Sequence, residues 1–189
     1  FQAKLDWMLD FVKTECEPID LLFPHHGDPY DTSNAKARAI IAPLQDQVKA
    51  QGLWAFGHPR ELGGMGMPFM EYVYLNEVIG RSEFAQRIFG TYTLQDSMML
   101  DLYASTAQRE KYLMPLAAGE INPSFAMTEP GVSSSDPTQI ETTAVLDGDH
   151  WVINGRKWFT TGANIAAYTT VMCRTEPDAP AHSAFSMIL

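Results

Sequence analysis

Residues 125–136 read FAMTEPGVSSSD, and they lie at the point where the pattern of the chain changes. Before this stretch, apolar residues recur at three- and four-residue spacings, which indicates helices packed on one side. After it, short segments rich in Thr, Val, Ile and aromatic residues alternate with turn signals, which is typical of strands. The sequence therefore predicts an α+β protein, with an all-α domain over 1–121 followed by a β domain over 122–189.

Two amphipathic helices are predicted in the first third of the chain. Proline lacks the N–H that a helix interior needs, so the first helix should stop at Pro18. The second should begin after Ser33, kink at Pro43 and end near Gly52, because glycine enters the left-handed region without steric cost. The buried stripes are predicted to contain Leu5, Met8, Leu9 and Val12 in the first helix, and Ala37, Ile40, Ile41, Leu44 and Val48 in the second.

The rest of the helical domain contains one loop and further helices. Segment 57–68 is rich in glycine and proline, which predicts a loop that crosses the surface. Segment 69–82 is apolar almost all round, which predicts a central and largely buried helix. Further helices are predicted over 84–103 and 105–118.

The β domain is predicted from strand and turn signals. Asp147-Gly148 supplies the positive φ that a tight hairpin needs, so the segments before and after it should pair. Roughly seventy residues are too few to close an antiparallel barrel at about 8–12 residues for each strand and turn, so we expect only the first part of a barrel-like domain. The predicted strands cover residues 142–146, 151–153, 156–160, 168–174 and 186–189.

Composition excludes several classes of function. The chain has 13 basic and 23 acidic residues and a net charge of −10, so it should repel a nucleic-acid backbone rather than bind it. No apolar run is long enough for a transmembrane helix, and the first residues lack the apolar region of a signal peptide, so we expect a cytoplasmic protein. The two cysteines and five histidines show no ligand spacing, so we expect neither a disulfide scaffold nor a metal site.

Two segments carry residues suited to ligand binding. In 125–136, hydroxyls and backbone N–H groups around Gly131 could form a nest for a phosphate or pyrophosphate, although a serine-rich turn would have the same composition. In NGRKWFTTGA, residues 154–163, two adjacent aromatic residues precede two hydroxyls. One aromatic ring could stack on a planar ligand while the other fills the core, or both could belong to the core.

Four stretches make the sequence similar to one family of flavoproteins. They read PRELGGMG at 59–66, QREKYLMPLAAGE at 108–120, MTEPG at 127–131 with a following SSD, and NGRK at 154–157. In these stretches the chain resembles the amino-terminal and middle parts of the acyl-CoA dehydrogenase family. Its loop between Gly131 and Asp136 is one residue longer than the common form, which is similar to the subgroup whose animal members add a phosphotransferase-like domain.

The resemblance implies a fold of three parts: a helical amino-terminal domain, a middle β domain and a carboxy-terminal four-helix bundle, with FAD between the last two. The bundle is absent from this chain, and the family's catalytic base lies in it. We therefore expect a truncated enzyme that is inactive alone and has no catalytic residue of its own. Glu129 lies in the flavin loop, but a structural role, accepting bonds from backbone or positive groups, is favoured over a role as base.

The resemblance also implies which residues contact the ligands. Thr128 would donate to the polar edge of the flavin ring, and Ser135 would reach the pyrophosphate and the pantetheine side of the substrate. Phe159, where tryptophan is usual in the family, would pack against the flavin, and Thr161 would place a hydroxyl near its N5. The implied FAD contacts are Phe125, Met127, Thr128, Ser134, Ser135, Phe159, Thr160 and Thr161, and the implied substrate contacts are Ser135, Leu94 and Gln95.

The activity that the resemblance implies is FAD-dependent oxidation of an acyl-CoA thioester to the trans-2-enoyl-CoA, with a medium to long or unusual acyl chain. Acyl-CoA oxidases and flavin monooxygenases share the fold, and a noncatalytic flavin- or acyl-CoA-binding subunit is the alternative from another class. The implied partners are an electron-transfer flavoprotein and further copies of the chain, in a homodimer or homotetramer. In a eukaryote the compartment would be the mitochondrial matrix or the peroxisome.

Overall fold

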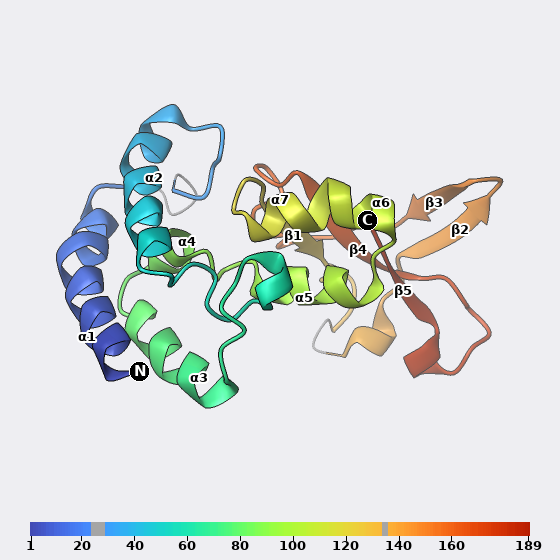
Figure 1. Ribbon diagram of the computed structural model, residues 1–189. Coiled ribbons are helices and arrows are strands. Elements are labelled where there is room, and N and C mark those ends of the chain that lie inside the picture. Colours follow the sequence, from blue (N-terminus) through green and yellow to red (C-terminus); the bar gives the residue numbers. More distant parts are fainter. Residues whose placement is uncertain (24–28, 134–135) are drawn as a thin grey trace. The chain divides into compact units, whose positions relative to one another are not determined.

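The computed structural model describes residues 1–23, 29–133 and 136–189. These residues form two compact units, Phe1–Asn122 and Pro123–Leu189 (Figure 1). The first unit is helical and the second contains a five-stranded sheet, which confirms the predicted α+β class. None of the helices in the described part of the chain is both long and apolar enough to span a lipid bilayer.

The first unit is built from short helices. Its α-helices are α1 (Gln2–Phe11), α2 (Ala35–Ala50), α3 (Phe69–Ile79), α4 (Ala85–Phe89), α5 (Leu94–Tyr103), α6 (Thr106–Gln108) and α7 (Met114–Ala117). It also has π-helical turns at Val12–Cys16 and Arg109–Leu113, and 3₁₀ turns at Glu17–Leu21 and Arg60–Leu62. A capping box of Ser105 and Gln108 begins α6, since each side chain bonds to the backbone of the other.

The two predicted amino-terminal helices are present, with differences in detail. The chain stays helical through Pro18, because proline fits the first positions of a 3₁₀ turn, where its missing N–H is not needed. The side chain of Asn34 caps α2 by accepting hydrogen bonds of 3.1 Å from two backbone N–H groups. Gly52 follows α2 with a φ of 66°, as predicted. Ile40 is exposed rather than buried, because it lies beside the buried stripe of α2 and not on it.

Helix α3 is less buried than the sequence predicts. Its buried residues are Leu75, Val78 and Ile79 in the last turns, whereas Phe69 and Met70 at its start are 73% and 62% exposed. A helix buries only the part that packs on its neighbours, and α3 contacts α1 and α4. The prediction of a largely buried helix is therefore wrong for the first half of α3.

The glycine- and proline-rich segment 57–68 does not lie wholly on the surface, as was predicted. His58 is fully buried, and its Nε2 lies 3.2 Å from Oγ of Ser97 and 3.4 Å from Oγ1 of Thr93. Burial lowers the pKa of His58 to about 4, so the ring is neutral at neutral pH. Leu62 is buried as well. Part of this loop therefore belongs to the core of the first unit.

Aromatic side chains occupy that core. Phe89 contacts Phe11 edge-on, with ring centroids 5.8 Å apart. Trp54 is also buried, and its Nε1 donates to the carbonyl oxygen of Ala117 over 3.2 Å. Gly90 has a φ of 69°, and a Cβ at this position would lie 2.5 Å from the Trp54 ring. The absence of a side chain at Gly90 is therefore what lets the tryptophan pack there.

The second unit is a mixed sheet. Its strands are β1 (Pro123–Ala126), β2 (Thr143–Asp147), β3 (His150–Asn154), β4 (Tyr168–Arg174) and β5 (Phe185–Ile188), with 3₁₀ turns at Pro137–Gln139 and Ala181–Ser183. Strand β4 pairs in parallel with β1 and antiparallel with β5. Arg174 at the end of β4 pairs with Thr143 of β2, and β2 and β3 form an antiparallel hairpin. The parallel pairings were not part of the sequence prediction.

The predicted hairpin is confirmed, and one predicted strand is absent. Asp147 pairs with His150 across a turn in which Gly148 has a φ of 63°. Segment 156–160 forms no strand, contrary to prediction, because Phe159 has a φ of 52°, outside the extended region. This segment is a loop, and the sheet resumes at β4.

Candidate functional site

Two loops of the second unit carry most of the residues that the sequence singled out. The first loop (127–133) follows β1, and the second loop (155–161) follows β3. The N–H of Trp158 donates to the carbonyl oxygen of Thr128 over 3.0 Å. Nζ of Lys157 donates to the carbonyl oxygen of Met127 over 2.9 Å. These bonds hold the two loops side by side.

Glu129 completes this connection. Its side chain is 6% exposed, and one carboxylate oxygen accepts a 2.9 Å bond from Nζ of Lys157. The carboxylate also accepts bonds of 2.8 and 2.9 Å from the backbone N–H groups of Glu141 and Thr142. Burial acts to raise the pKa of Glu129, but the hydrogen bonds from Thr142, Glu141 and Lys157 outweigh it and lower the pKa to about 2.

Glu129 therefore has a structural role and not a catalytic one. A general base works best with a pKa near the working pH, and a carboxylate with a pKa of about 2 holds protons too weakly for that role. Its oxygens are also engaged by three donors. The predicted role, accepting bonds from backbone and positive groups, is confirmed.

The two adjacent aromatic residues of the second loop lie at the surface. Trp158 is 43% exposed and Phe159 is 77% exposed, and their ring centroids are 4.6 Å apart. The possibility that both belong to the core is therefore wrong. Contact of an apolar ring with water is unfavourable, so covering it with a ligand stabilises the complex. An exposed aromatic pair beside a loop with polar groups is therefore suited to stacking on a planar ligand.

Three hydroxyls of these loops are available to a ligand. The hydroxyls of Thr128, Thr160 and Thr161 form no hydrogen bond with any residue that the structure describes. Phe125 in β1 and Met127 just after it are half-buried. The structure thus brings six of the eight predicted FAD contacts into one part of the second unit: Phe125, Met127, Thr128, Phe159, Thr160 and Thr161.

The other two predicted FAD contacts, Ser134 and Ser135, lie outside the described residues, so the predicted phosphate nest is not tested. Asp136 just after them is exposed and caps the following turn. Its carboxylate accepts bonds of 2.6 and 3.0 Å from the hydroxyl and N–H of Thr138. A bond from Gln139 adds to these, and together they lower the pKa of Asp136.

The predicted substrate residues Leu94 and Gln95 belong to the first unit, at the start of α5. Both line one pocket of about 290 Å³. Thr91 lies in the same pocket with a buried hydroxyl that has no hydrogen-bond partner among the described residues. The remaining lining residues are Tyr72, Asn76, Gln86 and Tyr92.

Sequence reasoning missed parts of both regions. Tyr72 and Asn76 are four residues apart in α3 and could have been assigned to one helix face from that spacing alone. Nothing in the sequence pairs Lys157 with Glu129, which lies 28 residues earlier.

Within 1–23, 29–133 and 136–189, no group of three or more His, Cys, Asp or Glu side chains is placed to hold a metal ion.

Both units of the chain match models of a known protein family. Residues 5–120 match the family model described as "Acyl-CoA dehydrogenase, N-terminal domain", and residues 124–189 match "Acyl-CoA dehydrogenase, middle domain". The chain belongs to the acyl-CoA dehydrogenase family. The family resemblance drawn from its motifs is therefore confirmed, as is a fold that joins the helical amino-terminal domain to the start of the middle β domain.

Individual members of the family show the same relation. "Acyl-CoA dehydrogenase FadE29" of Mycobacterium tuberculosis (strain ATCC 25618 / H37Rv) is 36% identical over 190 residues, which cover 100% of this chain and 45% of that protein. "Acyl-CoA dehydrogenase family member 10" of Mus musculus is 33% identical over 191 residues, which cover 96% of this chain and 18% of that protein. The crystal structure of an acyl-CoA dehydrogenase from Geobacillus kaustophilus is similar with a TM-score of 0.65 and 25% identity, over 99% of this chain and 46% of that one.

The chain thus spans less than half the length of these family members. What it has in common with them is the part of the acyl-CoA dehydrogenase fold formed by the amino-terminal and middle domains. The two loops described above belong to the residues matched by the middle domain, and the pocket at Leu94 and Gln95 belongs to those matched by the amino-terminal domain.

Proposed function

We propose that this chain is part of an FAD-dependent acyl-CoA dehydrogenase, which converts an acyl-CoA thioester to the trans-2-enoyl-CoA. Membership of the family supports the reaction class. The observation that carries the proposal is the surface formed by the two loops, where an exposed aromatic pair lies beside hydroxyls that have no partner among the described residues. The family relation alone would not require these groups to be free.

The residues present fit the flavin ring system. Its faces are planar and apolar, and its edge carries hydrogen-bonding atoms. Phe159 and Trp158 supply exposed apolar surface, and the hydroxyl of Thr128 lies on the loop that is bonded to them. In this proposal Phe125, Met127, Thr160 and Thr161 complete the contacts with the ring, and Ser134 and Ser135 bind the pyrophosphate.

FAD, when bound, supplies the acceptor for the hydride that leaves the β-carbon of the acyl group. The work of this chain is to bind and orient. Lys157 and Glu129 fix the second loop against the first, so the aromatic pair is held in place before the ligand arrives. This preorganisation reduces the ordering that binding would otherwise require.

The α-proton of the substrate must go to a base. Glu129 is unsuited to that role, since its carboxylate is fully engaged and its pKa is about 2. We propose that the base is a carboxylate of the carboxy-terminal domain of the family. Leu94 and Gln95 would contact the acyl part of the substrate, which we take to be a medium to long or unusual chain.

The same proposal includes the partners that the family resemblance implies. Electrons would leave the flavin for an electron-transfer flavoprotein, and the protein would act as a homodimer or homotetramer. Rapid reoxidation by oxygen, with release of hydrogen peroxide, would instead identify an acyl-CoA oxidase of the same fold. Size-exclusion chromatography with light scattering measures the assembly directly.

The test is an anaerobic titration of the full-length protein, as its gene encodes it, with acyl-CoA thioesters of several lengths. We expect a bound flavin that is released as FAD, loss of its visible absorption on adding a substrate, and a product lighter than the substrate by two hydrogen atoms. Free CoA serves as the control and should leave the flavin oxidised. A protein without flavin, or a flavin that no acyl-CoA reduces, would refute the proposal.

A further inference from the structure

A buried arginine in the first unit lacks a charged partner. Arg87 in α4 is 5% exposed, and its Nη1 donates bonds of 3.0 Å to the hydroxyl of Tyr92 and to the carbonyl oxygen of Gly119. Its Nε is buried and has no hydrogen-bond partner among the described residues. No carboxylate of the described residues forms a salt bridge with Arg87, so the contacts that it makes are to neutral groups.

Such a charge is costly unless something compensates it. A buried ionised group normally pairs with an opposite charge, because neutral hydrogen bonds recover only part of the lost hydration. A guanidinium presents five N–H donors in a rigid plane that matches the two oxygens of a carboxylate or phosphate group. Arg87 therefore retains donor capacity of a kind that suits an oxyanion.

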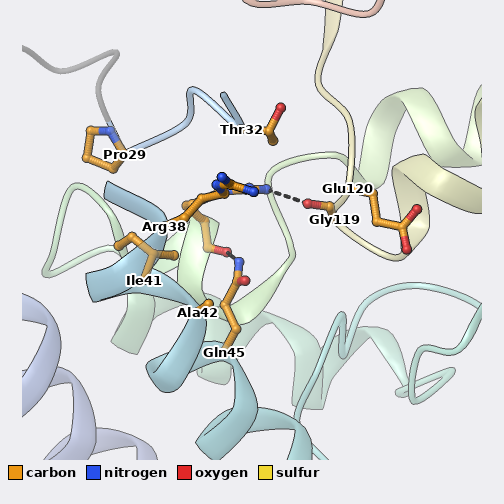
Figure 2. A pocket seen from close by; sticks show the side chains of 9 residues that line it. Pro29, Thr32, Arg38, Ile41, Ala42, Gln45, Gly119 and Glu120 are labelled. Carbon is orange, nitrogen blue, oxygen red and sulfur yellow. Dashed lines mark hydrogen bonds between the residues drawn. The ribbon is translucent and has the colours of Figure 1, made fainter. Parts of the chain in front are cut away.

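Arg87 lines a pocket of about 270 Å³ in the same unit. Figure 2 shows Arg38 and Gln45 of α2 on one side of this pocket, and Gly119 and Glu120 on the other. Nε2 of Gln45 donates to the carbonyl oxygen of Arg87 over 3.0 Å, which fixes the backbone of α4 against α2. The remaining lining residues are Pro29, Thr32, Ile41 and Ala42.

The charges of the lining indicate the class of ligand. Arg38 is exposed and adds a second guanidinium, while the carboxylate of Glu120 partly offsets the two positive charges. The lining thus carries a net charge of +1 in a chain whose net charge is −10. It shares no residue with the pocket at Leu94 and Gln95.

We propose that this pocket binds a small molecule through an oxyanion, a carboxylate or phosphate group, that contacts Arg38 and Arg87. The hydroxyl of Thr32 adds a further donor at the same pocket. Glu120 weakens the attraction for an anion and favours ligands that also carry a hydrogen-bond donor. This site is additional to the proposed flavin and acyl-CoA contacts and does not depend on them.

Calorimetric titration of the full-length protein with inorganic phosphate, and separately with acetate, tests the proposal. We expect saturable binding of at least one anion, and the stronger of the two identifies the group that the site prefers. Arg38→Gln should weaken binding roughly tenfold, the effect of losing one charge-assisted hydrogen bond. Glu120→Gln should strengthen it about threefold, since a repulsive charge is removed.

Lys36→Gln is the matched control, because Lys36 is an exposed cation of α2 that does not line the pocket. Its affinity for the anion should equal that of the unchanged protein, and chloride at equal ionic strength should give no saturable heat. Absence of saturable binding to both anions would overturn the proposal. So would affinities that are the same in Arg38→Gln, Glu120→Gln and Lys36→Gln.

Discussion

Glu129 and Arg87 are both buried charges, and the two units of the protein hold them in opposite ways. Glu129 in the second unit accepts bonds from Lys157 and from two backbone N–H groups. Arg87 in the first unit donates only to a hydroxyl and a carbonyl oxygen, and its Nε has no partner among the described residues. The first charge is fully engaged by its own chain, and the second is not.

The difference separates two uses of a buried charge. A charge whose bonds are all made inside the chain fixes structure, as Glu129 does by joining the loops that carry Thr128 and Trp158. A charge with unused hydrogen-bond donors next to a pocket is suited to binding a ligand.

The largest effect is expected from Lys157→Met. The change removes one partner of a buried pair and leaves the Glu129 carboxylate with less compensation, so the free energy of unfolding should fall by about 3–5 kcal/mol. Denaturant titration measures this. Lys36→Met, at an exposed lysine, should change it by less than about 0.5 kcal/mol. Adding Glu129→Gln to Lys157→Met should recover part of the loss, and a purely additive double variant would show that the pair is not coupled.

The next largest effect is the loss of the stability contributed by Glu129 at low pH. Its pKa in the folded protein is about 2 and lies below the ordinary value of 4.5, so its contribution is fully present above pH 4.5 and is lost as the pH falls toward 2. The shift corresponds to roughly 3 kcal/mol. The difference in unfolding free energy between the unchanged protein and Glu129→Gln should narrow over this range. The titration of His58, between about pH 6.5 and 4, is common to both proteins and cancels.

A smaller effect is expected from Arg87→Met, even though Arg87 is as buried as Glu129. The change frees two neutral acceptors and strands no opposite charge, so the free energy of unfolding should fall by about 1–2 kcal/mol. Of phosphate and acetate, the anion that binds more strongly should then stabilise the unchanged protein and not the variant, because a ligand stabilises only the state that binds it. Thermal unfolding with and without that anion measures both effects. If Arg87→Met lowered the free energy of unfolding more than Lys157→Met does, the difference proposed between Arg87 and Glu129 would be wrong.

The smallest effect concerns the surface that Glu129 and Lys157 support. Phe159→Ala in the full-length protein should weaken FAD binding about five- to tenfold, since stacking of an aromatic ring contributes about 1 kcal/mol beyond its buried area. Fluorescence titration of the flavin-free protein with FAD measures the affinity. Trp151→Ala is the control, because Trp151 is an aromatic residue of β3 that is 46% exposed and lies outside the two loops. Equal losses in both variants would show that Phe159 is not a specific contact.

The parts of the fold that could be predicted depend on neighbours in sequence. The turn at Gly148 and the end of α2 at Gly52 both follow from the ability of glycine to adopt a positive φ. The exposure of Phe69 could not be predicted in the same way, because burial depends on which distant segments pack on α3. The absent strand at 156–160 has a similar origin. Trp158 and Phe159 favour strands locally, but bonds from the second loop to the first loop override that preference.

In the candidate site, too, the residues that could be predicted are those in short sequence motifs. Thr128 and Phe159 could be found from motifs, because each lies in a short and distinctive stretch. The pairing of Lys157 with Glu129 could not, since it joins two loops that are separate in sequence. Arg87 lies in no motif, and its importance follows only from its burial and from the neutral character of its partners.

The different roles of Glu129 and Arg87 are tested most directly by the FAD content of Lys157→Met and Arg87→Met in the full-length protein. The ratio of flavin to protein absorption measures this content in samples with unchanged circular dichroism. We expect Lys157→Met to lose FAD, because the loop with Trp158 and Phe159 is no longer fixed. We expect Arg87→Met to keep FAD at the level of the unchanged protein. Full retention of FAD by Lys157→Met, or equal loss in both variants, would contradict these different roles.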